Sequence, residues 1–450
     1  MGRRLLGWLT VLCLGLQAAL LLVGPFVSTD TFRYIHEGRA QRSGLATPYR
    51  AAPRELSGVR TPWPDDGTSA RVEHRDVPAA YLPGAELLLL GTTAVGDAIG
   101  APLLPLRVLL LGGVVAVVAW LWRRAFETRQ RLEHQGSKTR HLDLKQQSFA
   151  WGALLIAGQP LVLFESGLEA HLDGAALPLL AVVVGGGSLL AGLALGLLVH
   201  VKPVALLLLP LLPARARVVA LAAAVVVAVP HLLAGVVVPP GLLAYGTRWR
   251  AHPIGFALLE APFALALPEG VYVHAHVSSR GLLVEAAGVP VVALGDAVVV
   301  DQPVLLDPTL GGKVVAFVAA VVVVVQVRRR WPATDLAGGV GIVLLTWLLL
   351  TPTLHPWYGL WLVVPAALTS SRALRRGLWT FAALLPLLHQ SDFARAATGV
   401  WHEALWPRVV VVAGAVLAWL SGWRFIKGAQ AHDQEAGAAQ PEKGRDPRSR

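Results

Sequence analysis

Four short polar segments interrupt the apolar runs of this 450-residue chain, and each carries side chains that could do chemistry. They are STDTFRYIHEGR (28–39), FESGLEAHLD (164–173), VHVKP (199–203) and TPTLHPWY (351–358). A carboxylate takes a proton from a hydroxyl group, and cations with backbone donors hold a phosphate and stabilise the charge that develops on it. Aromatic rings stack on sugar faces. The segments therefore favour group transfer between a phosphate-bearing donor and a hydroxyl acceptor.

The elements that must position these segments are membrane helices. The chain is 55% hydrophobic and only 15% charged, whereas a soluble domain is about 25% charged. Its net charge is +11, with basic residues at the ends of apolar runs and in the tail. That pattern sets membrane orientation and attracts anionic lipid headgroups, and it requires no nucleic acid. The single cysteine, Cys13, lies in the first apolar run, so no internal disulfide is possible.

The basic clusters also predict which way the chain enters the membrane. Arg3 and Arg4 place the N terminus in the cytoplasm, and an apolar helix over residues 7–27 then delivers residue 28 to the outer face. Residues 84–100 are apolar but contain Glu86 and Asp97, and a charge at the bilayer centre costs about 2.5–3.5 kcal/mol. The cluster that begins at Arg123, after the next apolar run, belongs in the cytoplasm. We therefore expect 84–100 to be an interfacial amphipathic helix on the outer face.

The same reasoning along the whole chain predicts an all-α polytopic membrane protein with about twelve spans, roughly 10–13, and both termini cytoplasmic. Residues 1–427 form one transmembrane domain, with a first outer loop at 28–103 and a second outer region at 241–312. Residues 282–300 are expected to be interfacial. The run 175–198 is expected to form two short helices, because three glycines at 185–187 interrupt it. Residues 428–450 are expected to be a disordered cytoplasmic tail.

Read in order, these segments resemble the bacterial polyprenol-phosphate-mannose-dependent mannosyltransferases of the GT-C superfamily. The matching stretches are TDTFRYIHEGRAQRSGLATPYRAAP (29–53), VPAAYLP (77–83), EAHLDGAALPLL (169–180), VHVKPVALLLLPLL (199–212) and HPWYGLWLVVP (355–365). The resemblance implies a GT-C-like fold with amphipathic helices in long outer loops. It also implies transfer of a hexose, with mannose as the first candidate, from a polyprenyl phosphate sugar. The acceptor is a glycolipid or glycan at the outer face of the bacterial cytoplasmic membrane.

The resemblance also assigns roles to residues. In that family an acidic residue soon after the first helix is taken as the catalytic base, which corresponds to Asp30. The transfer is expected to invert the anomeric centre, with no metal and no cofactor. The residues expected to contact substrate are Arg33, Tyr34, Glu37, Arg39, Tyr81, His171, Asp173, Lys202, Arg248, His355, Trp357 and Tyr358. Lys202 and Arg248 are expected to neutralise the phosphate. Family members often carry two adjacent acids where this chain has Thr29 and Thr31 around Asp30.

Several of these residues have a structural interpretation as well. Asp30 is equally placed to N-cap a helix that starts near Phe32, and Glu37 and Arg39 are near enough in sequence to pair with each other. His171 and Asp173 are also compatible with a hydrogen-bonded loop pair. A metal site that joins them to Asp30 has no supporting spacing. The rings of segment 355–358 also fit an aromatic belt at the membrane surface.

Two other classes of function remain compatible with the sequence. A transporter or flippase of lipid-linked sugars would show internal repeats and polar residues on both sides of a midplane site, whereas the polar segments here crowd one predicted face. An inactive membrane scaffold is the third interpretation.

Overall fold

The computed structural model describes residues 3–25, 27–43, 48–56, 66–134, 140–266, 271–278, 292–294, 297–306 and 308–438. Long apolar runs become helices, because a helix satisfies its own backbone hydrogen bonds where no water is available. The helices are α1 (Arg3–Leu20), α2 (Asp30–Arg42), α3 (Pro83–Ala98), α4 (Leu104–His134), α5 (Arg140–Ala157), α6 (Ala176–Gly185), α7 (Ser188–Val201), α8 (Ala214–Leu233), α9 (Pro240–Arg248), α10 (Phe256–Ala266), α12 (Pro308–Arg330), α13 (Leu336–Leu350), α14 (Leu360–Leu368), α15 (Arg372–Leu384), α16 (Gln390–Thr398) and α17 (Leu405–Ala438).

Within the described part of the chain, five helical segments are long and apolar enough to cross a membrane. They are Leu104–Thr128, Ala214–Leu233, Pro308–Arg330, Ala333–Leu350 and Leu405–Gly422. A sixth span results if Phe149–Ala157 and the π-helical turn Val162–Leu168, which bend by 56° at their junction, are counted as one. The other apolar helices, including α1, α6, α7 and α10, are shorter. The apolar helices are thus compatible with the predicted membrane character. The number of described helices that are long and apolar enough to span, five or six, is smaller than the predicted twelve.

The break expected in the run 175–198 is confirmed. α6 ends at Gly185 and α7 begins at Ser188, and Gly186 and Gly187 between them have extended backbone angles. α7 packs against α8, and α6 packs against α14 and α4. These short helices contribute to the largest hydrophobic core, which contains the fully buried ring of Trp361.

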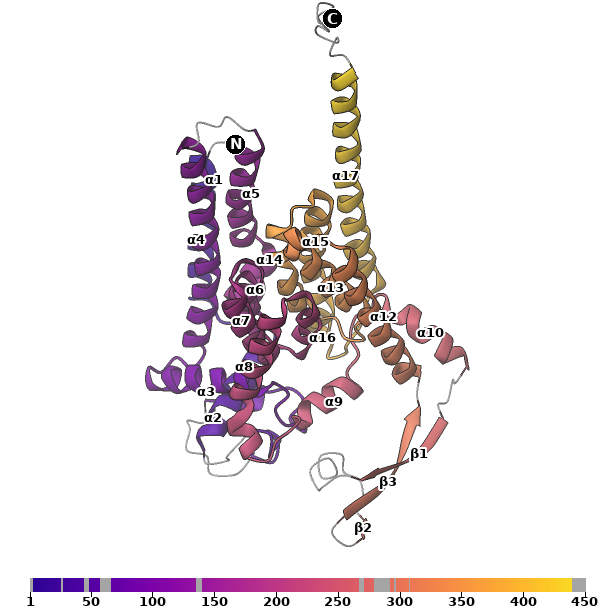
Figure 1. The fold of residues 1–450 in the computed structure, drawn as a ribbon. Coiled ribbons are helices and arrows are strands. Elements are labelled where there is room, and N and C mark those ends of the chain that lie inside the picture. The colour runs from indigo at the N-terminus through magenta and orange to yellow at the C-terminus, as the bar shows by residue number, and fades with distance from the viewer. Residues whose placement is uncertain are drawn as a thin grey trace, which may run out of the picture.

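α2 and α3 lie across one end of the helix bundle, the end away from the start of α1 and the end of α17 (Figure 1). α3 occupies most of the stretch predicted as an amphipathic helix, and it runs across α4 rather than alongside it. Its carboxylate Asp97 faces α2, where it accepts hydrogen bonds from Arg39 and Arg42. Leu87, Val95 and Ile99 are exposed on the same helix. The polar side of α3 therefore packs against α2, and its apolar side is exposed.

A small antiparallel sheet, which the sequence did not suggest, lies within residues 241–312, the predicted second outer region. Its strands are β1 (Val271–Ser278), β2 (Val292–Leu294) and β3 (Ala297–Leu306), in the order β1-β3-β2. Val271 pairs with Leu306, and Val292 pairs with Val299. Valine is frequent in these strands, and β-branched residues suit a pleated sheet. The described residues of 282–300, which we expected to be interfacial, belong to these strands.

The C-terminal helix is longer than expected. α17 continues to Ala438, so the prediction that disorder begins at residue 428 is wrong for residues 428–438. Alanine and glutamine are frequent there, and their high helix propensity lets the helix continue past the apolar run. Residues 439–450 lie outside the described part of the chain.

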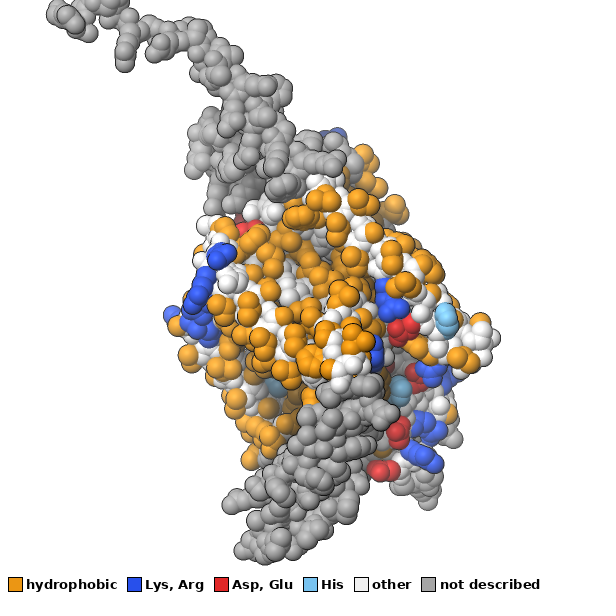
Figure 2. All heavy atoms as spheres, turned by 90° about the vertical axis from the view of Figure 1, so that its right-hand side faces the viewer, with side chains coloured by type: hydrophobic (Ala, Val, Ile, Leu, Met, Phe, Trp, Pro, Cys, Tyr) orange, Lys and Arg blue, Asp and Glu red, His pale blue; other side chains and the backbone are white. Residues whose placement is uncertain are grey.

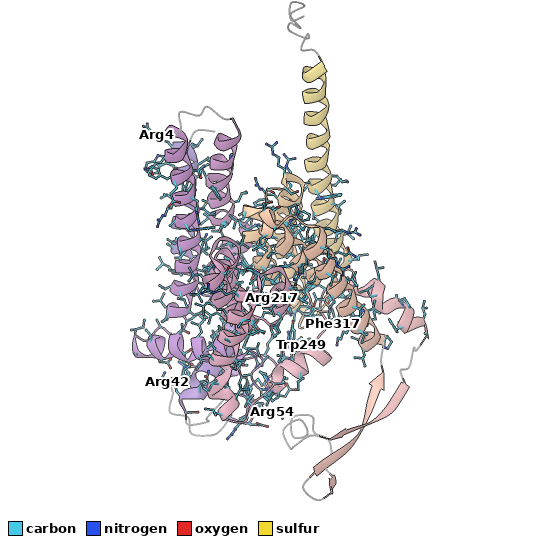
Figure 3. All side chains as sticks on the ribbon, in the orientation of Figure 1. Arg4, Arg42, Arg54, Arg217, Trp249 and Phe317 are labelled. Atoms are coloured by element: carbon cyan, nitrogen blue, oxygen red, sulfur yellow. The ribbon has the colours of Figure 1, made fainter. Side chains whose placement is uncertain are left out.

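The surface carries a broad hydrophobic area over α12 and α17, with charged side chains mostly at its edges (Figure 2). Exposed residues of this area include Phe317, Val322, Leu417 and Trp419. Arg4 lies at one end of the molecule, and Arg42 and Arg54 lie at the other (Figure 3). An apolar band between two charged ends is typical of a protein that spans a bilayer.

Candidate functional site

Four segments that are far apart in the sequence meet beside the N terminus of α2. Asp30 begins α2, and His171 and Asp173 follow the π-helical turn Val162–Leu168. Lys202 follows the last residue of α7, and Trp357 lies in the turn before α14. The structure therefore brings together residues from each of the four polar segments.

Asp30 is the partly exposed carboxylate of this group, with 33% of its side chain accessible. It is the first residue of α2, while Thr29 occupies the N-cap position. The prediction of Asp30 as N-cap is therefore wrong by one residue. The helix N terminus favours a negative charge at this position. Burial nevertheless raises the pKa of Asp30 to about 7, although the guanidinium of Arg33 opposes the shift.

His171 is completely buried beside Asp30. Its Nδ1 atom lies 3.8 Å from Asp30 Oδ2, and its Nε2 atom lies 3.4 Å from Glu165 Oε2. The imidazole of His171 stacks on the ring of Trp357, with centroids 3.9 Å apart. The imidazole of His355 also stacks on Trp357, with centroids 4.4 Å apart. Burial lowers the pKa of His171 well below its usual value, and the cations of the site add to this effect. The ring is therefore neutral at physiological pH.

Lys202 and Asp173 form an ion pair in the site. Lys202 Nζ lies 2.6 Å from Asp173 Oδ1, and the same oxygen accepts a hydrogen bond from the indole of Trp361 at 2.6 Å. The ammonium also lies 3.4 Å from the centroid of the Tyr358 ring and 5.9 Å from that of Trp347. Burial lowers the pKa of Lys202, and Asp173 counteracts this. An ammonium has three donors, so this pairing leaves capacity for another anion.

Two pairs of tyrosines complete the group. Tyr81 donates its hydroxyl to that of Tyr34 at 3.2 Å, and the hydroxyls of Tyr245 and Tyr358 are hydrogen-bonded to each other. The charge of Asp30 contributes to raising the pKa of all four, although burial is the larger cause. The hydroxyl of Tyr34 also accepts a hydrogen bond from the N–H of Leu172, and the ring of Tyr358 packs against Lys202, so both pairs adjoin the group.

The local backbone explains why the carboxylates and the imidazole converge. Two residues after the π-helical turn lies Ala170, a buried non-glycine residue with a φ of 56°. Such a conformation costs roughly 1–2 kcal/mol for an L-residue. Glu169 accepts hydrogen bonds from the backbone N–H groups of Val27 and Ser28 at 3.2 and 2.9 Å. This contact holds the chain just before α2 against the turn that carries His171.

Arg107 joins the same two segments from α4. Its guanidinium donates to the carbonyls of Leu20, Leu21 and Val23, which follow α1 or end it, and to the carbonyl of Gly167. The last carbonyls of a helix lack the usual N–H partner one turn further on, and that of Leu20 accepts one other hydrogen bond here, from the N–H of Val23. A single buried side chain therefore fixes the end of α1 relative to the π-helical turn.

Three residues outside the predicted set of site residues extend the group beyond His171. Glu165 accepts a hydrogen bond from Nε2 of His389 at 2.7 Å, and Asp392 contacts Nδ1 of the same ring at 2.7 Å. Burial alone would lower the pKa of His389, but its bonds to Asp392 and Glu165 raise it to about 9. Glu165 lies inside one of the four polar segments, which was a usable signal. His389 and Asp392 follow an apolar run, which gave no signal that a site residue lies there.

Other predicted contact residues lie outside the group. Arg33 donates to the carbonyls of Glu73, His74 and Val77 and to the carboxylate of Glu37. Arg39 binds Asp66 and Asp97. The side chain of Arg248 lies outside the described residues.

The expected pair of Glu37 with Arg39 is therefore wrong. Residues two apart on a helix lie on different faces, whereas residues four apart are neighbours. Arg33 and Glu37 satisfy that spacing, with 3.3 Å between their charged atoms.

Two alternative interpretations can be compared with the geometry. His171 does not pair with Asp173, because it faces Asp30 and Glu165 instead. The rings of Trp357 and Tyr358 pack against His171 and Lys202, so they belong to the group around Asp30. In the ranges that the structure describes, no three His, Cys, Asp or Glu side chains are arranged to hold a metal ion.

Known families, curated proteins and solved structures were each compared with this chain, and none of the three comparisons gives a match.

Proposed function

We propose that this protein is a membrane glycosyltransferase of the GT-C type. It transfers a hexose, with mannose as the first candidate, from a polyprenyl phosphate sugar to a hydroxyl of a glycolipid or glycan. The observation that carries the proposal is the meeting of a partly exposed carboxylate, Asp30, with a buried lysine, Lys202, among aromatic rings. The resemblance of the polar segments to the polyprenol-phosphate-mannose-dependent enzymes supports the same conclusion.

Each part of the group has a role in this reaction. Asp30 takes the proton of the acceptor hydroxyl while that oxygen attacks the anomeric carbon. The bond from this carbon to the phosphate oxygen breaks, and the polyprenyl phosphate leaves with the electron pair. Lys202 stabilises the charge on the leaving phosphate. The single displacement inverts the anomeric centre.

The pKa of Asp30 suits a general base. A carboxyl with an ordinary pKa near 3.8 is a weak base, whereas one shifted to about 7 holds a proton more tightly. The best catalytic pKa lies near the operating pH. Asp30 is therefore matched to proton abstraction at neutral pH.

The proposal includes the orientation of the chain. The site faces the outside of the bacterial cytoplasmic membrane, both termini are cytoplasmic, and the chain crosses the membrane about twelve times if the shorter apolar helices also span. α3 lies on the outer surface with its apolar side towards lipid. Its crosswise position on the bundle (Figure 1) and its exposed Leu87 and Val95 support this placement.

The test is sugar transfer by the purified protein. Radiolabelled polyprenyl phosphate mannose is incubated with a panel of glycolipid and glycan acceptors. We expect transfer by the wild type and a loss of about 10²–10⁴-fold in kcat for Asp30→Asn, the range for removal of a general base.

Asp76→Asn provides the matched control, because Asp76 is an exposed acid of the same outer segment and lies outside the group. Equal rates for Asp30→Asn and Asp76→Asn would remove Asp30 from the role of base. Absence of transfer with every donor and acceptor, together with movement of the lipid-linked sugar across vesicles, would favour the flippase.

A further inference from the structure

Behind the proposed base, five ionisable side chains form a continuous row. Its members in spatial order are Asp30, His171, Glu165, His389 and Asp392. The successive contacts between them measure 3.8, 3.4, 2.7 and 2.7 Å. The three middle members are essentially inaccessible, with side-chain exposures of 0, 0 and 2%. The two ends are accessible, at 33% for Asp30 and 28% for Asp392.

The middle of the row contains unsatisfied polar atoms. Both ring nitrogens of His171 and Oε2 of Glu165 are buried without a hydrogen-bond partner. Leaving buried polar atoms unpaired costs roughly 1–3 kcal/mol each, so such atoms call for an explanation. They are the atoms through which a proton would pass from Asp30 to Glu165.

We infer that this row is the exit path for the proton that Asp30 removes from the acceptor hydroxyl. The inference rests on the proposed function. It assigns Glu165, His389 and Asp392 as proton-carrying residues that do not touch the substrate. The row leads from the reacting end, at the start of α2, to the first turn of α16, so the proton leaves on a different side from the departing phosphate.

The charges around the row keep a proton from remaining on His171. The imidazolium of His389 and the ammonium of Lys202 both oppose a lasting positive charge on its ring. A proton that reaches His171 therefore moves on to a neighbouring acceptor, and the carboxylate of Glu165 lies 3.4 Å from Nε2 of the ring.

Each step moves one proton, and the balance closes. Asp30 passes its proton to Nδ1 of His171, and the proton on Nε2 of His171 moves to Oε2 of Glu165. His389 carries a proton on each ring nitrogen, and it gives the Nδ1 proton to Asp392, which releases it to solvent. The carboxyl of Glu165 and the ring of His389 then turn, and the proton on Glu165 restores the imidazolium. The ring of His171 also turns, so that its remaining proton again faces Glu165 and its free nitrogen faces Asp30. One proton enters and one leaves, and no oxidant or other reactant is needed.

The kinetic test uses Glu165→Gln, His389→Gln and Asp392→Asn in the full chain. We expect kcat to fall about tenfold to hundredfold, at or below the range for direct removal of an acid or base, with an unchanged KM for the donor. Added imidazole should restore part of the rate in His389→Gln. A residue that only supports the fold would not give this rescue.

Two matched controls lie outside the row. Glu260→Gln removes a buried carboxylate that pairs with Arg250 at 2.6 Å. His200→Gln removes a buried imidazole that contacts the N–H of Gly84 and the carbonyl of Ala224. If the row variants lose no more kcat than these controls, or if imidazole rescues none of them, the exit path is overturned.

A spectroscopic measurement separates this inference from the proposed function. In protein labelled with nitrogen-15 histidine, Asp392→Asn should shift the signals of both His389 and His171, because the row links their protons. Asp392 is partly exposed, so this variant should fold. A shift confined to His389 overturns the inference. If Asp392→Asn shifts both signals but the wild type transfers no sugar, the proposed function is contradicted and the row is still supported.

Discussion

At the scale of single residues, the site is defined by how burial and charge compete at Asp30. The helix N terminus and Arg33 favour its carboxylate form, whereas burial and the neighbouring acids Glu73, Glu37 and Asp173 oppose it. The net shift raises its pKa to about 7. Lys202 resolves the same competition differently, because it has Asp173 at 2.6 Å to hold its charge.

The shift at Asp30 predicts a pH dependence of both rate and stability. The carboxylate is the active form of a base, so kcat/KM should rise with pH and level off above about pH 7. The folded state binds this proton more tightly than the unfolded state. The free energy of unfolding should therefore fall as the pH rises from about 4 to about 7.

A pH–rate profile and chemical unfolding in detergent at pH 5, 6, 7 and 8 test both parts. Asp30→Asn should flatten the stability change over this interval. A rate profile that stays level down to pH 5 would show that Asp30 titrates in its ordinary range or is not the base.

At the scale of elements, the site depends on joints between helices more than on the helices themselves. The π-helical turn Val162–Leu168 and the strained Ala170 bring Glu165, Glu169 and His171 to one side. π-helical turns are rare and often occur at functional sites. Gly241, at the start of α9, makes a comparable joint. A Cβ atom there would lie 2.2 Å from the carbonyl oxygen of Pro78. Only glycine therefore lets the start of α9, the helix that carries Tyr245, approach Pro78 this closely.

Arg107 gives a prediction at this scale. Arg107→Met removes a buried guanidinium and leaves the carbonyls of Leu20, Val23 and Gly167 without that donor. Each buried unsatisfied group costs about 1–3 kcal/mol. We expect the free energy of unfolding to fall by about 3 kcal/mol or more, and the midpoint of thermal unfolding to fall with it.

Arg123→Met tests the same chemical change on the exposed side of α4, where the side chain of Arg123 is 79% accessible and pairs with Glu127. That variant should change the stability by less than about 0.5 kcal/mol. Equal effects of the two substitutions would show that the carbonyl contacts of Arg107 contribute nothing.

At the scale of the whole molecule, the arrangement separates a crosswise layer from an upright bundle (Figure 1). α2, α3 and α9 lie at the end opposite the termini, and the polar sides of α2 and α3 face each other through Arg39 and Asp97. The hydrophobic area over α12 and α17 (Figure 2) is compatible with contact to lipid. Which end of the bundle faces outward is part of the proposal and rests on the basic clusters of the sequence.

Thiol labelling in intact cells tests that topology. Cys13 is the only cysteine, so Cys13→Ala gives a background free of thiols. Ala98→Cys, on an exposed position of α3, should react with a membrane-impermeant maleimide from outside. Arg330→Cys, at the end of α12, should react only after the cells are permeabilised. The reverse pattern would place the site in the cytoplasm.

The sequence predicted much of the candidate site because its residues are conspicuous. A lysine, an aspartate or a histidine among apolar residues is costly without a partner, so Asp30, His171, Asp173 and Lys202 stood out, and the structure places them together. Arg33, Glu37 and Arg39 stood out for the same reason, yet they hold α2 in place. Charge alone does not reveal whether the partner is a substrate or another part of the chain.

The sequence by itself determined the helical and apolar character of this protein, because hydropathy and helix breakers act over a few neighbouring residues. It also determined the break between α6 and α7, where glycines stop the helix. Only the tertiary structure decided the row from Asp30 to Asp392. Glu165 and His389 are separated by 224 residues, and no local pattern encodes which distant side chains will meet. The same holds for Arg107, whose four carbonyl partners are assigned by packing and not by spacing.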